Sequence, residues 1–355
     1  HVWFDAMSRL DVLRPTDVPH ATEYVGQIVA LIADLMAKNA AYQTDDGIYM
    51  SVRTVKDYGL LAHQSIDDMV AGAGEREVFG AGQKRYPADF VLWKFSKPQE
   101  PAWPSPWGEG RPGWHSECVV MSLELLGEGF DLHCGGVDLR FPHHENERAQ
   151  AVALGKDFAR HWMHNAFVVD IEGEKMSKSL GNVTNLPDLL DHYDPRAYRL
   201  LLLQTHYRSP IKVGTENIDA AVNALAGVDA FHSRTSTLAS SAADEATLTA
   251  FRAAMDDDLN TPVAVGVMFD AIRRANVAAD VGDTATVAAL AAAVREMCTA
   301  VGLRLSSVSV SDEMLVRAKA LDTARAARDF ATADAIRNEL QALGYLVETT
   351  KDGTR

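Results

Sequence analysis

Residues 141–147 read Phe-Pro-His-His-Glu-Asn-Glu, and this stretch concentrates imidazole and carboxylate groups around a single proline. If the residues after Pro142 form a helix, as a proline in a first turn favours, His143 and Glu147 project from one face, one turn apart. A thiolate from Cys118 would complete a three-ligand set, and zinc accepts all three ligand types while keeping a position open. The pattern predicts a zinc site, although a lone His/Glu pair is usually a surface hydrogen bond and a lone cysteine usually a buried small hydrophobe.

A second cluster follows at residues 175–182, which read Lys-Met-Ser-Lys-Ser-Leu-Gly-Asn. Lys175 and Lys178, with two neighbouring hydroxyls, form a cationic loop that can follow polyphosphate charge as it moves to a leaving group. A solvated turn is the plainer alternative. Gly135 and Gly136, followed by Asp138, allow the backbone to approach a ligand closely, but paired glycines also make ordinary turns.

Composition restricts the class of protein. The chain has 355 residues, is 47% hydrophobic and carries a formal net charge of −15, so we expect two to four domains and no general affinity for nucleic acid. Local basic patches would still suffice for contacts with RNA phosphates. Three scattered cysteines indicate a reducing compartment and thiols that serve as ligands. We find no signal peptide and no apolar run of about 18 residues, and we expect a cytoplasmic protein without a membrane partner.

Several motifs together resemble one known family. They are Asp-Phe-Val-Leu-Trp-Lys at 89–94, Trp-Pro-Ser-Pro-Trp-Gly at 103–108, Gly-Trp-His-Ser-Glu-Cys at 113–118, the 141–147 stretch, the lysine loop, His-Tyr-Arg-Ser-Pro at 206–210 and Asp-Asp-Asp-Leu-Asn-Thr-Pro at 256–262. On these motifs the sequence resembles the bacterial cysteinyl-tRNA synthetases, a family of class I aminoacyl-tRNA synthetases, over essentially its whole length.

The resemblance implies roles for individual residues. Cys118, His143 and Glu147 fall on the family's zinc ligands, with one zinc per chain, and Trp114 falls on a residue that lines the cysteine pocket. Lys178 falls on the lysine that contacts ATP, and Lys175 shares its catalytic loop. The segment that borders the adenylate in this family corresponds to His133, Gly135, Gly136 and Asp138.

The resemblance also implies the fold: an α/β class I Rossmann-type catalytic domain, then an all-α helical bundle and a small C-terminal anticodon-type domain. We expect a partial Rossmann domain with the connective insertion at 1–165, the signature loop and stem-contact region at 166–235, the bundle at 236–308 and the small helical domain at 309–355. The family's chain opens with a cysteine zinc ligand and a His-x-Gly-His motif, and neither occurs here. We therefore expect an N-terminally truncated, inactive synthetase, in which Cys134 or His144 is a candidate for the vacant ligand position.

Hydrophobic periodicity and turn signals place the elements. We expect a helix at 22–39, a strand at 48–52, a loop at 98–112, a helix at 118–126, a buried strand at 130–133, the zinc helix at 143–154 and a strand at 166–170. Helices follow at 186–203, with Pro195 opening a second one, and at 216–233, 246–255, 262–277, 286–302 and 331–343. Ser311 is a candidate N-cap of a basic helix, Cys298 a core residue, and 345–348 a short strand.

The function implied by the resemblance is ATP-dependent activation of L-cysteine, with magnesium, followed by transfer of the cysteinyl group to tRNA(Cys). We expect a monomer in which zinc selects the thiolate. Two alternatives stay open. One is the related ligase of the mycothiol pathway, which joins cysteine to an amino-sugar inositol, and the other is a catalytically incomplete fragment that binds tRNA.

Overall fold

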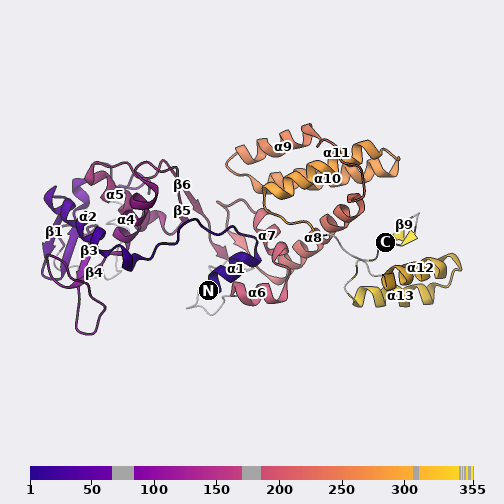
Figure 1. The fold of residues 1–355 in the computed structure, drawn as a ribbon, viewed down its shortest axis with the longest axis horizontal. Helices are drawn as coiled ribbons and strands as arrows, with labels where there is room; N and C mark the ends of the chain where they lie inside the picture. Colours follow the sequence, from indigo (N-terminus) through magenta and orange to yellow (C-terminus); the bar gives the residue numbers. More distant parts are fainter. Residues whose placement is uncertain are drawn as a thin grey trace. The chain divides into compact units, whose positions relative to one another are not determined.

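The structure, a computed structural model, describes residues 1–65, 84–169, 185–306 and 312–343, with 345, 347, 349–350 and 353–354. Contacts divide the chain into two compact units. The first, which we call the sheet unit, contains residues 14–168 and 207–211, and the second, the helical unit, contains residues 1–13, 169–206 and 212–355. Figure 1 draws both, from the indigo N-terminus to the yellow C-terminus.

A four-stranded antiparallel sheet with the order β1-β2-β3-β4 begins the sheet unit. Its strands are β1 (Ala41–Thr44), β2 (Gly47–Met50), β3 (Phe90–Phe95) and β4 (Gly110–Pro112). All four residues of β2 are buried, because the predicted apolar stripe of α2 (Val25–Ala37) packs in the same core as Ile48 and Met50. Two short 3-10 helices, η1 (Ala21–Glu23) and η2 (Val52–Thr54), precede α2 and follow β2.

The same unit contains a βαβ arrangement that positions the residues of interest. After α4 (Trp114–Leu126), β5 (Leu132–Gly136) leads through η3 (Arg140–His144) and α5 (Glu145–Leu154) to β6 (His161–Asn165). β5 and β6 are parallel. Both therefore end at the same edge, where open α/β folds place ligands. A cis peptide bond joins Phe141 to Pro142 just before the ligand candidates.

The helical unit is built almost entirely from helices. They are α1 (Val2–Arg9), α6 (Leu186–His192), α7 (Pro195–Leu203), α8 (Thr215–Thr235), α9 (Glu245–Asp256), α10 (Thr261–Asp280), α11 (Thr284–Ala300), α12 (Asp312–Ala326) and α13 (Phe330–Ala342). Aspartate or asparagine side chains cap α7, α9, α10, α11 and α13 by accepting backbone N–H bonds. β7 (Val168–Val169) pairs with β8 (Ile211–Lys212), and β9 (Thr349–Thr350) pairs with β10 (Gly353–Thr354).

Most helix predictions are confirmed to within a few residues, including the break at Pro195 and the buried position of Cys298. Three predictions are wrong, and one predicted helix has a misplaced start. The strand expected at 130–133 is β5, which begins at Leu132 and is largely accessible. The helix expected from Cys118 begins four residues earlier, because Gly113 is its N-cap. The expected loop at 98–112 ends in β4, and neither Tyr345 nor Val347 lies in a strand.

Two further predictions have other outcomes. Ser311, the candidate N-cap, lies outside the described residues. The division into four domains stays a prediction beside the two contact-defined units. Among the described residues, no helix combines the length and the apolar character that crossing a membrane requires.

Candidate metal centre

Cys118, His143 and Glu147 converge in the sheet unit, although Cys118 lies on α4 and the other two on the η3–α5 segment. One ligand atom from each, the cysteine Sγ, an imidazole nitrogen and a carboxylate oxygen, lies within 4.8 Å of the others. The i, i+4 spacing works as predicted because His143 already has helical geometry as the chain enters α5. A thiol, an imidazole and a carboxylate in one buried cluster are the donor types of a zinc centre.

Both carboxylate oxygens of Glu147 are placed so that they could bind a metal ion. The Glu147 side chain is fully buried, with Oε1 2.9 Å from His143 Nε2 and Oε2 2.9 Å from His133 Nε2. Neither oxygen receives a well-aligned hydrogen bond from any residue that the structure describes. A buried carboxylate without aligned donors is costly unless a cation completes it.

The opposite side of the His143 ring is held by a neighbouring imidazole. His115 Nδ1 lies 2.8 Å from His143 Nδ1, so one ring donates and the other accepts. Because His143 Nδ1 is engaged in this way, its Nε2 is the nitrogen that faces Glu147. The ring of Trp114, the first residue of α4, lies 4.2 Å from the His143 ring, centroid to centroid, and stays 59% exposed.

A second set of possible ligand atoms shares the same carboxylate. His133, His144 and Glu147 also offer donor atoms within 4.8 Å of one another. His144 Nδ1 is already 2.8 Å from His164 Nε2, and the Trp162 ring packs against both His133 and His144. These hydrogen-bonded, ring-packed imidazoles form the wall behind Glu147.

Burial and neighbouring charge shift the ionisation of this cluster. Burial raises the pKa of the Cys118 thiol to about 12, and the adjacent Glu147 carboxylate adds to that effect. Burial also lowers the pKa of His115 to about 4. It would raise the pKa of Glu147, but His133 and His143 reverse this and hold that pKa at about 2. The carboxylate is therefore charged at neutral pH, whereas the Cys118 thiolate needs a nearby cation to form.

The structure gives a steric reason for the presence of glycine at the end of β5. A Cβ atom on Gly135 would lie 2.8 Å from the His144 ring, and one on Gly136 would lie 2.5 Å from the Asp138 carboxylate. At position 135 only glycine leaves room for the His144 imidazole, whereas at position 136 the obstacle is the end of the Asp138 side chain. A ligand contact for Gly135, Gly136 and Asp138, as expected from the sequence, stays a prediction.

The remaining predicted site residues are placed as follows. His133 lies on β5 against Glu147, and Trp114 lies over the His143 ring. Cys134 is exposed on β5 and belongs to neither ligand set. Lys175 and Lys178 lie outside the described residues.

Sequence reasoning missed His115 and His164, which contact the ligand candidates from α4 and β6. A signal was present, since six of the chain's 12 histidines fall between residues 115 and 164. That enrichment indicates an imidazole-rich site, but it does not indicate which rings meet.

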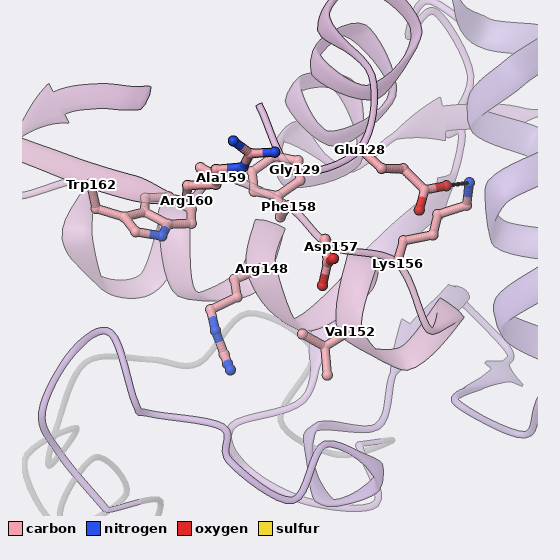
Figure 2. Close-up of a pocket in the computed structure, with 10 residues that line it drawn as sticks. All are labelled: Glu128, Gly129, Arg148, Val152, Lys156, Asp157, Phe158, Ala159, Arg160 and Trp162. Atoms are coloured by element: carbon pink, nitrogen blue, oxygen red, sulfur yellow. Dashed lines mark hydrogen bonds and ion pairs between the residues drawn. The ribbon is translucent and has the colours of Figure 1, made fainter. Parts of the chain in front are cut away.

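A pocket of about 340 Å³ is lined by residues of α5, by Glu128 and Gly129, and by residues from Lys156 to Trp162. Its cations already have partners: Lys156 pairs with Glu128, as the dashed line in Figure 2 shows, Arg148 pairs with Asp57, and Arg160 Nη1 lies 3.6 Å from Asp131 Oδ1. The lining is therefore charge-compensated and does not by itself favour an anionic ligand.

Comparison with family models establishes the class. Residues 1–223 match the model described as tRNA synthetases class I (C) catalytic domain, and residues 250–306 match the DALR domain. Among solved structures, Mycobacterium tuberculosis methionyl-tRNA synthetase in complex with methionyl-adenylate aligns with a TM-score of 0.55 at 15% identity, covering 85% of this chain and 75% of that one. This likeness shows the fold alone. It agrees with the predicted α/β class I architecture.

Curated relatives identify the family within that class. Cysteine--tRNA ligase of Edwardsiella ictaluri is 43% identical and covers 100% of this chain and 78% of its own length. The enzyme of the same name from Caldicellulosiruptor saccharolyticus is 41% identical over 99% of this chain and 79% of its own. That from Nocardioides is 42% identical over 99% and 78%. The chain therefore belongs to the cysteine--tRNA ligase family of class I aminoacyl-tRNA synthetases.

Proposed function

We propose that the chain belongs to an enzyme that activates L-cysteine with ATP and magnesium and transfers the cysteinyl group to tRNA(Cys), with a zinc ion selecting the substrate thiolate. The observation that carries this proposal is the convergence of Cys118, His143 and Glu147. The Glu147 carboxylate in this cluster receives no well-aligned hydrogen bond from the described residues. In the reaction, the cysteine carboxylate attacks the α-phosphorus and pyrophosphate leaves. A ribose hydroxyl of tRNA then attacks the acyl carbon, and AMP leaves.

The residues present fit a zinc ion. Cys118, His143 and Glu147 would hold it, one ion per chain, and zinc would supply an affinity for thiolate sulphur that a serine hydroxyl cannot match. The chain's own part is to prepare the site: His115 holds the His143 ring, and His133 lies against the second oxygen of Glu147. Trp114 would cover the substrate side, since its ring is exposed beside His143.

Selection by zinc matters because a pocket that measures size alone separates close analogues by only about 1–3 kcal/mol. Serine differs from cysteine by one atom, and their volumes are similar. Binding the thiolate to a metal adds a chemical criterion to size.

Family membership supports the remaining assignments, which we also propose. His133, Gly135, Gly136 and Asp138 would border the adenylate, and Lys178, with Lys175, would neutralise the phosphates during transfer. The chain would act as a cytoplasmic monomer. Of the alternatives, tRNA charging is favoured over amino-sugar ligation, because the relatives above are named cysteine--tRNA ligases and a DALR domain is present. That the chain is catalytically incomplete by itself stays a prediction.

Calorimetry with the zinc-loaded chain tests the proposed selectivity. We expect L-cysteine to bind and to release a proton, and L-serine to bind at least about 1,000-fold more weakly, beyond the roughly 10–200-fold that size discrimination achieves. Cys118→Ser should weaken zinc binding and cysteine binding together. Equal affinities for cysteine and serine in the presence of zinc would refute selection by the metal.

A further inference from the structure

Helix α5 presents polar groups on two sides, and only one side belongs to the candidate metal centre. His143 and Glu147 face the cluster, whereas Glu145 and Asn146, between them in sequence, point elsewhere because successive helical residues turn by about 100°. Both are nonetheless buried, at 0% and 2% exposure. Two buried polar side chains on the outer side of a ligand-bearing turn need partners of their own.

Their partners lie in one short segment, residues 57–62, which we call the bracing segment. The Tyr58 hydroxyl donates to Asn146 Oδ1 at 2.5 Å. The backbone N–H groups of Leu61 and Ala62 donate to Glu145 Oε2 at 2.8 and 3.0 Å. The bonds from Tyr58 and Ala62 are buried, so they form out of water, where direction matters most, and the bond from Leu61 is partly buried.

An arginine closes this contact from the next turn of α5. Arg148 donates from Nη2 to the carboxylate of Asp57, and its Nη1 lies 3.6 Å from Glu145 Oε1. Figure 2 shows its side chain extending from α5 at the edge of the pocket. The bracing segment is thus attached to α5 by a hydroxyl, by two backbone amides and by a guanidinium.

The same side of α5 is tied to the helix that carries the thiol. Ser116, two residues before Cys118, donates to Gln150 Oε1 at 2.8 Å, and Gln150 Nε2 donates to the Asn146 backbone carbonyl at 3.0 Å. Ser116 and Gln150 are fully buried. Rotation or translation of α5 relative to α4 would therefore break hydrogen bonds that have no water to replace them.

We propose that residues 57–62 are a positioning element for the metal centre. Through Tyr58, Asn146 and Glu145 they hold the first turn of α5, so that His143 and Glu147 meet Cys118 at ligand distance. This inference rests on the proposed zinc site, and it assigns the segment no contact with substrate. When residues that hydrogen-bond to or position a set of metal ligands are substituted, the affinity for the metal typically falls by about 10–100-fold.

A matched pair of tyrosines provides the test. Tyr58→Phe removes only the hydroxyl that reaches Asn146. Tyr42→Phe removes a similarly buried hydroxyl in the same unit, which donates to Asp89 Oδ2 at 2.7 Å and accepts from the Arg85 backbone N–H at 2.8 Å, and neither partner lies on α5. Zinc affinity is measured on the 355-residue chain by competition with a chromophoric chelator, together with the thermal midpoint of the zinc-free protein.

We expect Tyr58→Phe to weaken zinc binding by about tenfold. Tyr42→Phe should change it by less than about twofold, because distant sites act independently. Cobalt(II) gives a spectroscopic readout, since its thiolate charge-transfer band reports the sulphur of Cys118. That band should weaken or shift in Tyr58→Phe and stay unchanged in Tyr42→Phe.

A second pair covers the case in which one variant folds poorly. Glu145→Ala removes the acceptor for Leu61 and Ala62, whereas Glu145→Gln keeps a carbonyl oxygen at that position. We expect Glu145→Gln to retain most of the zinc affinity that Glu145→Ala loses, a rescue that a general loss of stability would not produce.

Two results would overturn the inference. If Tyr58→Phe and Tyr42→Phe bind zinc equally well, residues 57–62 only stabilise the fold, and the proposed function stands without them. If the unsubstituted chain binds no zinc, the proposed selection mechanism and this inference fail together.

Discussion

Two buried carboxylates, one in each unit, show how a structural ion pair differs from a candidate ligand. In the helical unit, Asp229 Oδ1 accepts from Arg196 Nη1 and from the Ser306 backbone N–H, each at 3.0 Å, and its Oδ2 lies 2.9 Å from Arg196 Nη2. In the sheet unit, both oxygens of Glu147 lie 2.9 Å from imidazole nitrogens without an aligned donor.

The two carboxylates are similar in burial and charge, and they differ in whether all of their oxygens accept well-aligned hydrogen bonds. Asp229 is 5% exposed and Glu147 is fully buried, and each has cationic or imidazole partners. A carboxylate whose oxygens are all satisfied stabilises the packing of its helices. A carboxylate whose oxygens point into a cluster of ligand atoms can still coordinate a metal ion. Changing each carboxylate in turn tests this distinction.

The largest effect on stability is expected at the satisfied carboxylate. Asp229→Ala leaves part of the buried Arg196 charge uncompensated and the Ser306 amide without an acceptor, which we expect to cost about 3 kcal/mol in the free energy of unfolding. Denaturant unfolding followed on the helical unit measures it, with zinc affinity as the control that should not change. A loss below about 1 kcal/mol, the level of a surface ion pair, would contradict a structural role.

Glu147→Gln should have the opposite profile. We expect zinc affinity to fall by at least about 100-fold, or about 2.7 kcal/mol, because a ligand charge is lost. The zinc-free protein should lose less stability than Asp229→Ala does, because the attraction of His133 and His143 for the carboxylate is lost but no well-aligned hydrogen bond disappears. If zinc-free Glu147→Gln were as destabilised as Asp229→Ala, Glu147 would be another structural ion-pair residue.

His115→Phe removes the imidazole that holds His143 but keeps an aromatic ring in its place. We expect zinc affinity to fall by about tenfold, because the His143 ring loses the contact that fixes its orientation. Chelator competition measures this effect. An unchanged affinity would show that packing against Trp114 alone orients the His143 ring.

The smallest expected effect is a pH dependence in the helical unit. Burial would raise the pKa of Asp194, but the hydrogen bonds from Arg196 hold it below its usual value. The stabilisation is therefore fully present above the unfolded pKa of about 3.9 and is lost as pH falls through the lower folded value. Urea titrations between neutral pH and pH about 3 should show a smaller loss in Asp194→Asn than in the unsubstituted chain. Identical pH profiles would contradict this assignment.

Much of the fold follows from local patterns. The apolar stripes of α2, α10 and α11 and the proline that opens α7 could be read from sequence because each signal spans one or two turns. The start of β5 could not, because Phe130 and Leu132 alternate like strand residues while the pairing begins where β6 offers a partner at His161.

The residues of the candidate site also divide into those that a local sequence pattern predicts and those that it does not. His143 and Glu147 were predicted because their spacing lies within one helix, and Cys118 because a thiol was needed to complete the set. His115, His164 and the bracing segment come from distant parts of the chain, and no local periodicity links them to α5. Their convergence depends on tertiary packing, which a single sequence does not encode in a local pattern.

The most direct test of the central claim is X-ray absorption at the zinc edge of the metal-loaded chain without substrate. We expect a first shell with one protein sulphur at about 2.3 Å and nitrogen or oxygen donors at about 2.0–2.2 Å, and loss of the sulphur contribution in Cys118→Ser. A shell without sulphur, or the same spectrum in Cys118→Ser, would contradict the assignment of Cys118, His143 and Glu147 as the metal centre.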